Sequence, residues 1–152
     1  MTGRQMRRQA GATAVEFALV LTAFLTLVLG ILDFSRMLYT WNAATEATRW
    51  GARTAVVCDR NDAAVLRNMR AILPQLTADN LQVTWFDAAG AVSNSCTFAN
   101  CGGVEVSVQN LDYAWISPIG FSSTRLFRMP SFSTYLSREI MGQDPNSTDI
   151  CD

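Results

Sequence analysis

The chain has 152 residues and a formal net charge of −1, which leaves room for a membrane segment and one modest domain. Its near-neutral charge creates no field that would attract nucleic acid. It contains no histidine, the commonest catalytic base and metal ligand. We therefore expect no enzyme, no cofactor, no metal site and no nucleic-acid partner.

Residues 1–11 form a short basic and polar segment that carries Arg4, Arg7 and Arg8. Arginines beside an apolar run favour the cytoplasmic side of a membrane. The other flank of the run offers only Arg36 as an early cation. The sequence therefore predicts a cytoplasmic N-terminal leader and an extracytoplasmic C-terminal part.

Residues 12–32 form an apolar run of membrane length with a single charged side chain, Glu16. At about 1.5 Å per residue, a helix over this run crosses a hydrocarbon core of about 30 Å. A cleaved secretory signal explains this run less well, because the run is long for a signal peptide and no small-residue cleavage pattern follows it. We expect a single-pass transmembrane helix, and a plain membrane anchor remains an alternative to any further role.

The helix is expected to continue beyond the membrane over residues 33–57 as an amphipathic segment. No proline interrupts residues 12–57, so a continuous helix there would be roughly 70 Å long. The apolar and small residues of the outer half recur at steps of three and four. They are Phe34, Met37, Leu38, Trp41, Ala44, Thr45, Thr48, Ala52, Ala55 and Val56.

Residues 58–152 are expected to form a small extracytoplasmic α+β domain. Asn61 and Asp62 predict the cap of a second helix near residues 62–73, and Pro74 marks its end. The chain offers no internal repeat that would suggest a second domain.

Alternating apolar and polar residues predict three strands, at residues 81–86, 104–108 and 131–137. We expect a small antiparallel sheet of about three strands, with one face packed on the long helix. Residues 111–128, which are rich in aromatic side chains, are expected to form an irregular loop folded over the sheet.

All four cysteines, Cys58, Cys96, Cys101 and Cys151, follow the apolar run. In an exported domain they predict two disulfides, with three possible pairings. In a cytosolic domain four thiolates could bind zinc, but the spacing contains no C-x-x-C motif.

Glu16 is an ionisable residue inside the start of a membrane segment, which is a functional hypothesis by default. No cation lies between residues 9 and 35 to pair with it. Either its carboxyl reaches the cytoplasmic interface or stays protonated, or cleavage after Gly11 creates an α-amino group on Ala12, one helical turn away. Composition alone does not choose between these solutions.

Residues 11–17 (GATAVEF), after a basic leader and before an apolar run, resemble the type IV prepilin processing site. The longer run GATAVEFALV is similar to TadE-like pseudopilins, minor components of the tight-adherence (Flp, type IVb) pilus. The similarity continues through residues 32–39 (LDFSRMLY) and 47–53 (ATRWGAR), and weakly at residues 129–134. The first 55 residues or so carry it, and the middle of the chain hardly does.

The resemblance implies a pilin-like fold and a minor pilin needed for pilus assembly, with a part in surface adhesion and biofilm formation. A prepilin peptidase would cleave after Gly11, leaving Ala12 as the new terminus, and Glu16 would neutralise a terminus in the membrane or the growing fibre. Five side chains would pack between helices: Phe17, Leu19, Val20, Leu21 and Phe24.

The implied partners are prepilin peptidase, other pilin or pseudopilin subunits and the assembly platform of the bacterial inner membrane. The implied location is that membrane, with possible incorporation into a pilus. The family does not assign the cysteines, and we favour Cys96 with Cys101 and Cys58 with Cys151.

Two further alternatives follow from the outer domain. Trp85, Tyr113 and Trp115 could form an adhesive face at a pilus tip, although aromatic residues of this kind are more often core. A membrane-anchored enzyme or thiol oxidoreductase would need a motif that the sequence lacks.

Overall fold

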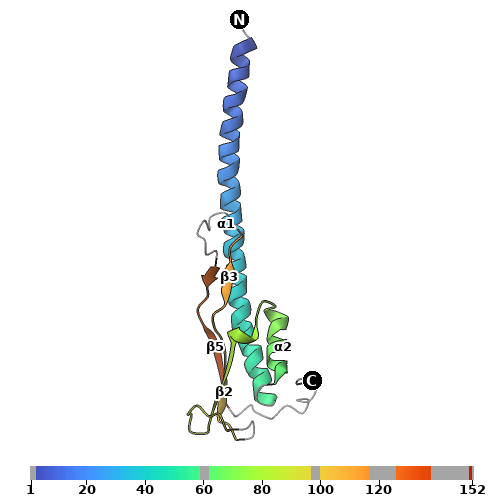
Figure 1. The fold of residues 1–152 in the computed structure, drawn as a ribbon, viewed down its shortest axis with the longest axis vertical. Coiled ribbons are helices and arrows are strands. Elements are labelled where there is room, and N and C mark those ends of the chain that lie inside the picture. The colour runs from blue at the N-terminus through green and yellow to red at the C-terminus, as the bar shows by residue number, and fades with distance from the viewer. Residues whose placement is uncertain (1–2, 59–61, 97–99, 117–125, 138–150, 152) are drawn as a thin grey trace. The chain divides into compact units, whose positions relative to one another are not determined.

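The computed structural model describes residues 3–58, 62–96, 100–116, 126–137 and 151 (Figure 1). Contacts divide the chain into two units. The first unit is Met1–Met37 with Ala114–Phe127, and the second is Leu38–Tyr113 with Arg128–Asp152. The fold is α+β, with a long N-terminal helix, a second short helix and a three-stranded antiparallel sheet.

The long helix, α1, runs without interruption over Gly3–Val57 (Figure 1, blue to green). Its continuity follows from the absence of proline, and it begins inside the segment expected as a leader. Among the described residues it is the one helix that is long and apolar enough, by length and composition, to cross a membrane. The predicted helix over residues 12–57 is confirmed.

The second helix, α2 (Ala63–Ile72), begins at the cap predicted for it. The Asp62 side chain accepts a hydrogen bond from the backbone N–H of Ala64 at 2.8 Å, which satisfies one of the free donors at the helix start. The helix buries Ala64, Val65 and Met69 on one face. Asn61 lies outside the described residues.

The sheet contains β1 (Leu81–Phe86), β2 (Gly103–Val108) and β5 (Phe132–Ser137) in the order β1-β2-β5. Both pairings are antiparallel, and they place Val83 and Thr134 on either side of Val106. The three predicted strands are confirmed, each within one residue of its expected bounds.

The expectation of an irregular loop over residues 111–128 is wrong at its two ends. There β3 (Asp112–Ala114) and β4 (Leu126–Arg128) form a two-stranded sheet. An ion pair between Arg128 and Asp112, at 3.6 Å, joins these strands. The intervening residues 117–125 lie outside the described residues.

The core of the second unit lies between one face of α1, α2 and the sheet. The central strand β2 buries Val104, Val106 and Val108. Two direct contacts join α1 to β5: the Trp41 ring meets the Phe132 ring edge-on at 5.2 Å between centroids, and the Thr48 and Thr134 hydroxyls lie 3.0 Å apart. The α1 residues of this face are small, which lets the helix approach closely. They are Ala44, Ala47, Thr48, Ala52, Ala55 and Val56.

Gly51 lies where α1 packs tightly against the core, so we expect Gly51→Leu to destabilise the second unit by about 1 to 3 kcal/mol. A Cβ atom at this position would lie 2.9 Å from the Met69 Cγ and 3.1 Å from the Val106 Cγ1. Both neighbours are fully buried, so a larger side chain at residue 51 would have to displace packed core atoms. The control is Asn42→Leu, which adds a similar side chain on the exposed side of α1. Urea unfolding followed by near-ultraviolet circular dichroism measures both, and equal stabilities would contradict the packing.

Candidate functional site

The segment that resembles a processing site is helical and exposed throughout residues 11–17. A Cβ atom added at Gly11 would meet no atom within 4 Å, so the backbone there is open to an approaching protein. Ala12 and Glu16 lie four residues apart in α1 and therefore on neighbouring turns of one side. Among the described residues, Glu16 has no hydrogen-bond or ion-pair partner.

The five side chains expected to pack between helices all lie on the exposed surface of α1. Their exposed fractions run from 40% for Leu21 to 68% for Leu19, with Phe17, Val20 and Phe24 between. Because they point in several directions around the helix, they leave it apolar on all sides. Such a surface is stable in lipid or against other helices, and not in water.

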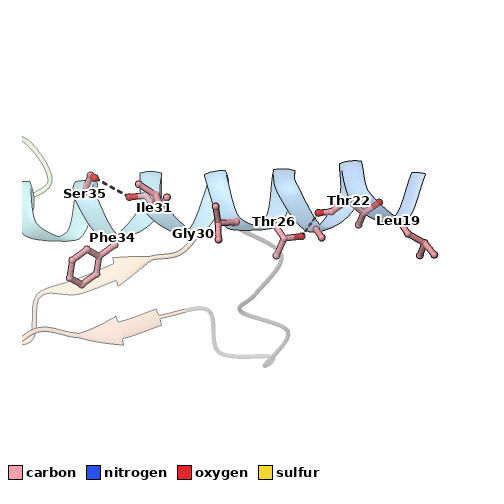
Figure 2. A pocket seen from close by; sticks show the side chains of 9 residues that line it. Leu19, Thr22, Thr26, Gly30, Ile31, Phe34 and Ser35 are labelled. Atoms are coloured by element: carbon pink, nitrogen blue, oxygen red, sulfur yellow. Dashed lines mark hydrogen bonds between the residues drawn. The ribbon is translucent and has the colours of Figure 1, made fainter. Parts of the chain in front are cut away.

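A shallow groove of about 830 Å³ follows one side of α1 within the first unit (Figure 2). Three of its lining residues carry hydroxyls, yet these do not point out as free donors. Thr22, Thr26 and Ser35 each donate to the carbonyl oxygen four residues earlier, at 2.7, 2.8 and 2.9 Å. The groove is therefore apolar in practice. Its lining is Leu19, Thr22, Ala23, Thr26, Leu27, Gly30, Ile31, Phe34 and Ser35.

Asp33, the carboxylate that follows the apolar run, is 1% exposed. The backbone N–H of Ile116 donates to both of its oxygens, at 3.1 and 3.2 Å, and the Arg36 guanidinium lies 3.5 Å away. Charge-assisted hydrogen bonds of this kind offset the cost of burying a carboxylate. The sequence suggests the Asp33–Arg36 pair by its spacing, but the Ile116 contact joins residues 83 positions apart and has no local signal.

Residues 11–53 match the family model described as TadE-like protein. This part of the chain is similar to TadE-like proteins. The matched region begins at Gly11 and contains Glu16, Asp33 and the groove, so it covers most of α1. No curated protein and no solved structure matches the chain.

The TadE-like family suggests a pilin associated with a tight-adherence pilus. Proteins of that family are structural and not enzymatic, and the match of residues 11–53 suggests pilus-related partners in general. The long apolar N-terminal helix is consistent with a single-pass membrane anchor.

Outside the TadE-like region, the four cysteines form two disulfides in the second unit. Cys58 is joined to Cys151 and Cys96 to Cys101, each with an S–S distance of 2.02 Å. These are the pairs favoured from the sequence. The ligand atoms of Cys58, Asp62 and Cys151 lie within 4.8 Å of one another, but sulfurs in a disulfide are not the thiolates that zinc requires.

Two of the three aromatic residues considered for an adhesive face belong to the core. Trp85 and Tyr113 are each 3% exposed, and Trp115 is half-buried. The Trp85 indole N–H is buried and, within the described part of the chain, has no hydrogen-bond partner. Trp85 and Tyr113 therefore belong to the interior of the second unit, and the three aromatic residues do not form one exposed adhesive face.

Proposed function

We propose that this chain is a minor pilin of a tight-adherence (Flp, type IVb) pilus, cleaved after Gly11 by a prepilin peptidase. The observation that carries the proposal is the TadE-like match, which begins at Gly11 and extends along a helix of membrane-spanning length. The open backbone at Gly11 and the three arginines before it suit a protease at the cytoplasmic face.

The proposed arrangement has four parts: a leader of residues 1–11, a transmembrane segment of residues 12–32, an amphipathic continuation of residues 33–57 and an outer domain of residues 58–152. The two disulfides support a periplasmic outer domain, because disulfides persist in oxidising compartments. The N-terminus is then cytoplasmic, and the chain is held in the bacterial inner membrane before any incorporation into a pilus.

In this arrangement the chain interacts with prepilin peptidase, with other pilin or pseudopilin subunits and with the assembly platform of the inner membrane. Phe17, Leu19, Val20, Leu21 and Phe24 supply the apolar surface for packing between helices. We assign adhesion and biofilm formation to the pilus as a whole, since Trp85 and Tyr113 are buried and do not supply an adhesive aromatic face.

Cleavage is tested by mapping the N-terminus of the protein from a host that produces a prepilin peptidase. We expect the mature chain to begin at Ala12. Gly11→Arg should block the cut, because it places a long side chain where the peptidase requires close access to the backbone. The matched control is Gly3→Arg, which makes the same change inside the leader and should leave cleavage intact. A mature chain that still begins at Met1 in the native host would exclude the proposal, and would favour a plain membrane anchor.

A further inference from the structure

The apolar surface of α1 does not end where the uncharged run ends. Large apolar or aromatic side chains remain exposed on both sides of Asp33. Their exposed fractions lie between 46% and 72%. They are Ile31, Leu32, Phe34, Leu38 and Tyr39.

Asp33 does not interrupt this surface, because its side chain belongs to the buried side of α1. Asp33, Thr40, Ala44 and Ala47 are all buried, and their spacings of seven, four and three residues place them on one side of the helix. Successive residues turn by about 100°, so Leu32 and Phe34 lie on the two flanks of Asp33. Around this turn the Asp33 carboxylate points inward and apolar groups point outward. The Arg36 side chain is 52% exposed, and because it lies near the end of the span its long stem can carry the guanidinium to the interface.

The contact with Asp33 also fixes the position of a second segment, residues 114–116, along the axis of α1. The Ile116 N–H lies 3.1 Å from one Asp33 oxygen and 3.2 Å from the other, so this residue is level with the end of the apolar run. The Ile116 side chain is nevertheless 64% exposed. A backbone held by a buried carboxylate thus presents an exposed isoleucine at the level of Asp33.

We propose that the membrane extends past Asp33, so that lipid contacts residues 17–38 of α1 and the Ile116 side chain forms a second contact with the outer leaflet. This proposal rests on the membrane anchor of the proposed function and adds a second segment to it. A helix over residues 17–38 is about 33 Å long, which matches a hydrocarbon core of about 30 Å.

Moving the membrane span from residues 12–32 to residues 17–38 improves the position of the groups at both of its ends. Glu16 moves from the membrane segment to the cytoplasmic interface, where a carboxylate costs much less. At the other end Tyr39 and Trp41, which are 72% and 42% exposed, fall where interfacial aromatic residues gather.

Lipid fits this surface better than a protein partner does. A single protein neighbour covers one stripe of a helix, whereas the exposed groups here occupy both flanks of Asp33 and the far side at Leu38. They are also continuous with the apolar surface of the run before them, which includes the groove that ends at Phe34 and Ser35 (Figure 2).

The test is a nitroxide spin label at residue 116 of the full chain in lipid vesicles. In the described part of the chain no cysteine is free, so Ile116→Cys introduces a thiol that labels selectively. Power saturation compares collisions with oxygen, which concentrates in lipid, and with a nickel chelate, which stays in water. Phe24→Cys is the lipid reference and Val92→Cys, an exposed apolar position of the second unit, is the reference outside the span.

We expect the label at residue 116 to collide more often with oxygen than with the nickel chelate, as at residue 24, and the label at residue 92 to show the inverse ratio. A label at Phe34→Cys should behave like that at residue 116, which provides a second site if Ile116→Cys does not fold. Asp33→Ala, which removes the acceptor, should move the ratio at residue 116 towards water while leaving residue 24 unchanged.

Two results would contradict the extended lipid contact, and a third would contradict the membrane anchor on which it rests. The label ratios at residues 24, 34 and 116 distinguish the three. A water-like ratio at residues 116 and 34, with a lipid-like ratio at residue 24, would overturn the extended contact and leave the anchor intact. Protection from both reagents at residues 116 and 34 would show a protein contact in place of lipid. A water-like ratio at residue 24 would instead overturn the membrane anchor of the proposed function.

Discussion

Glu16→Gln is expected to abolish pilus assembly while leaving the mature N-terminus at Ala12. The substitution keeps the size and the hydrogen-bonding oxygen of the side chain and removes its negative charge. After cleavage, the new α-amino group of Ala12 carries a positive charge at the start of an apolar helix. Residues 9–35 contain no anion other than Glu16 and Asp33.

Asp33 is unavailable to that amino group, because it is buried and accepts hydrogen bonds from Ile116. Glu16 is exposed and, among the described residues, has no ion-pair partner of its own. It is therefore the carboxylate that can neutralise a terminus, either its own or that of a neighbouring subunit. Near the cytoplasmic interface an unpaired charge costs little, but among the packed apolar helices of a growing fibre an unpaired amino group loses water and gains no partner. We therefore expect the loss of the carboxylate to act at incorporation and not at membrane insertion.

The measurement is pilus counting by electron microscopy, together with mass spectrometry of the mature chain. Glu46→Gln is the matched control, since it makes the same change within the TadE-like region at an exposed residue paired with Arg49. We expect normal piliation in the control. Normal piliation in Glu16→Gln would remove the role assigned to the carboxylate, and loss of cleavage in that variant would assign it to peptidase recognition instead.

The main elements could be predicted because each has a local cause. The absence of proline over residues 12–57 predicts one helix, and a side-chain cap at Asp62 followed by Pro74 predicts another. The strict alternation of Val104, Glu105 and Val106 predicts a strand with one buried face. In each case neighbouring residues along the chain determine the backbone.

The features that could not be predicted join distant residues. Asp33 is easily recognised in the sequence as the first charged residue after the apolar run. Its role as a hydrogen-bond acceptor, however, depends on a backbone N–H 83 positions away. The strand β3 is three residues long, too short for alternation to identify it, and it forms only with β4 as a partner. The close approach at Gly51 depends likewise on Met69 from another helix.

Removing the Cys58–Cys151 disulfide by Cys58→Ser with Cys151→Ser is expected to lower the stability of the second unit by about 4 to 5 kcal/mol. The bond joins residues 93 positions apart, and the entropy of an unfolded chain falls with the logarithm of the loop that a disulfide closes. It ties residue 151 to the end of α1, where the Arg67 guanidinium of α2 also donates to the Cys151 carbonyl at 3.4 Å. A small domain has few other sources of comparable stability.

The control is Cys96→Ser with Cys101→Ser, which opens a loop of only five positions and is expected to cost about 2 kcal/mol. Cys58 and Cys101 are fully buried and Cys96 is 8% exposed, whereas Cys151 is half-buried, so the control places more serine hydroxyls in the interior than the variant does. A larger loss in the Cys58 and Cys151 variant therefore reports loop length and not burial. Guanidinium unfolding of the full chain in detergent, followed by near-ultraviolet circular dichroism, measures both. An equal or larger loss in the Cys96 and Cys101 variant would show that the long loop is already constrained in the unfolded chain, and that the tether at residue 151 contributes little to the outer domain.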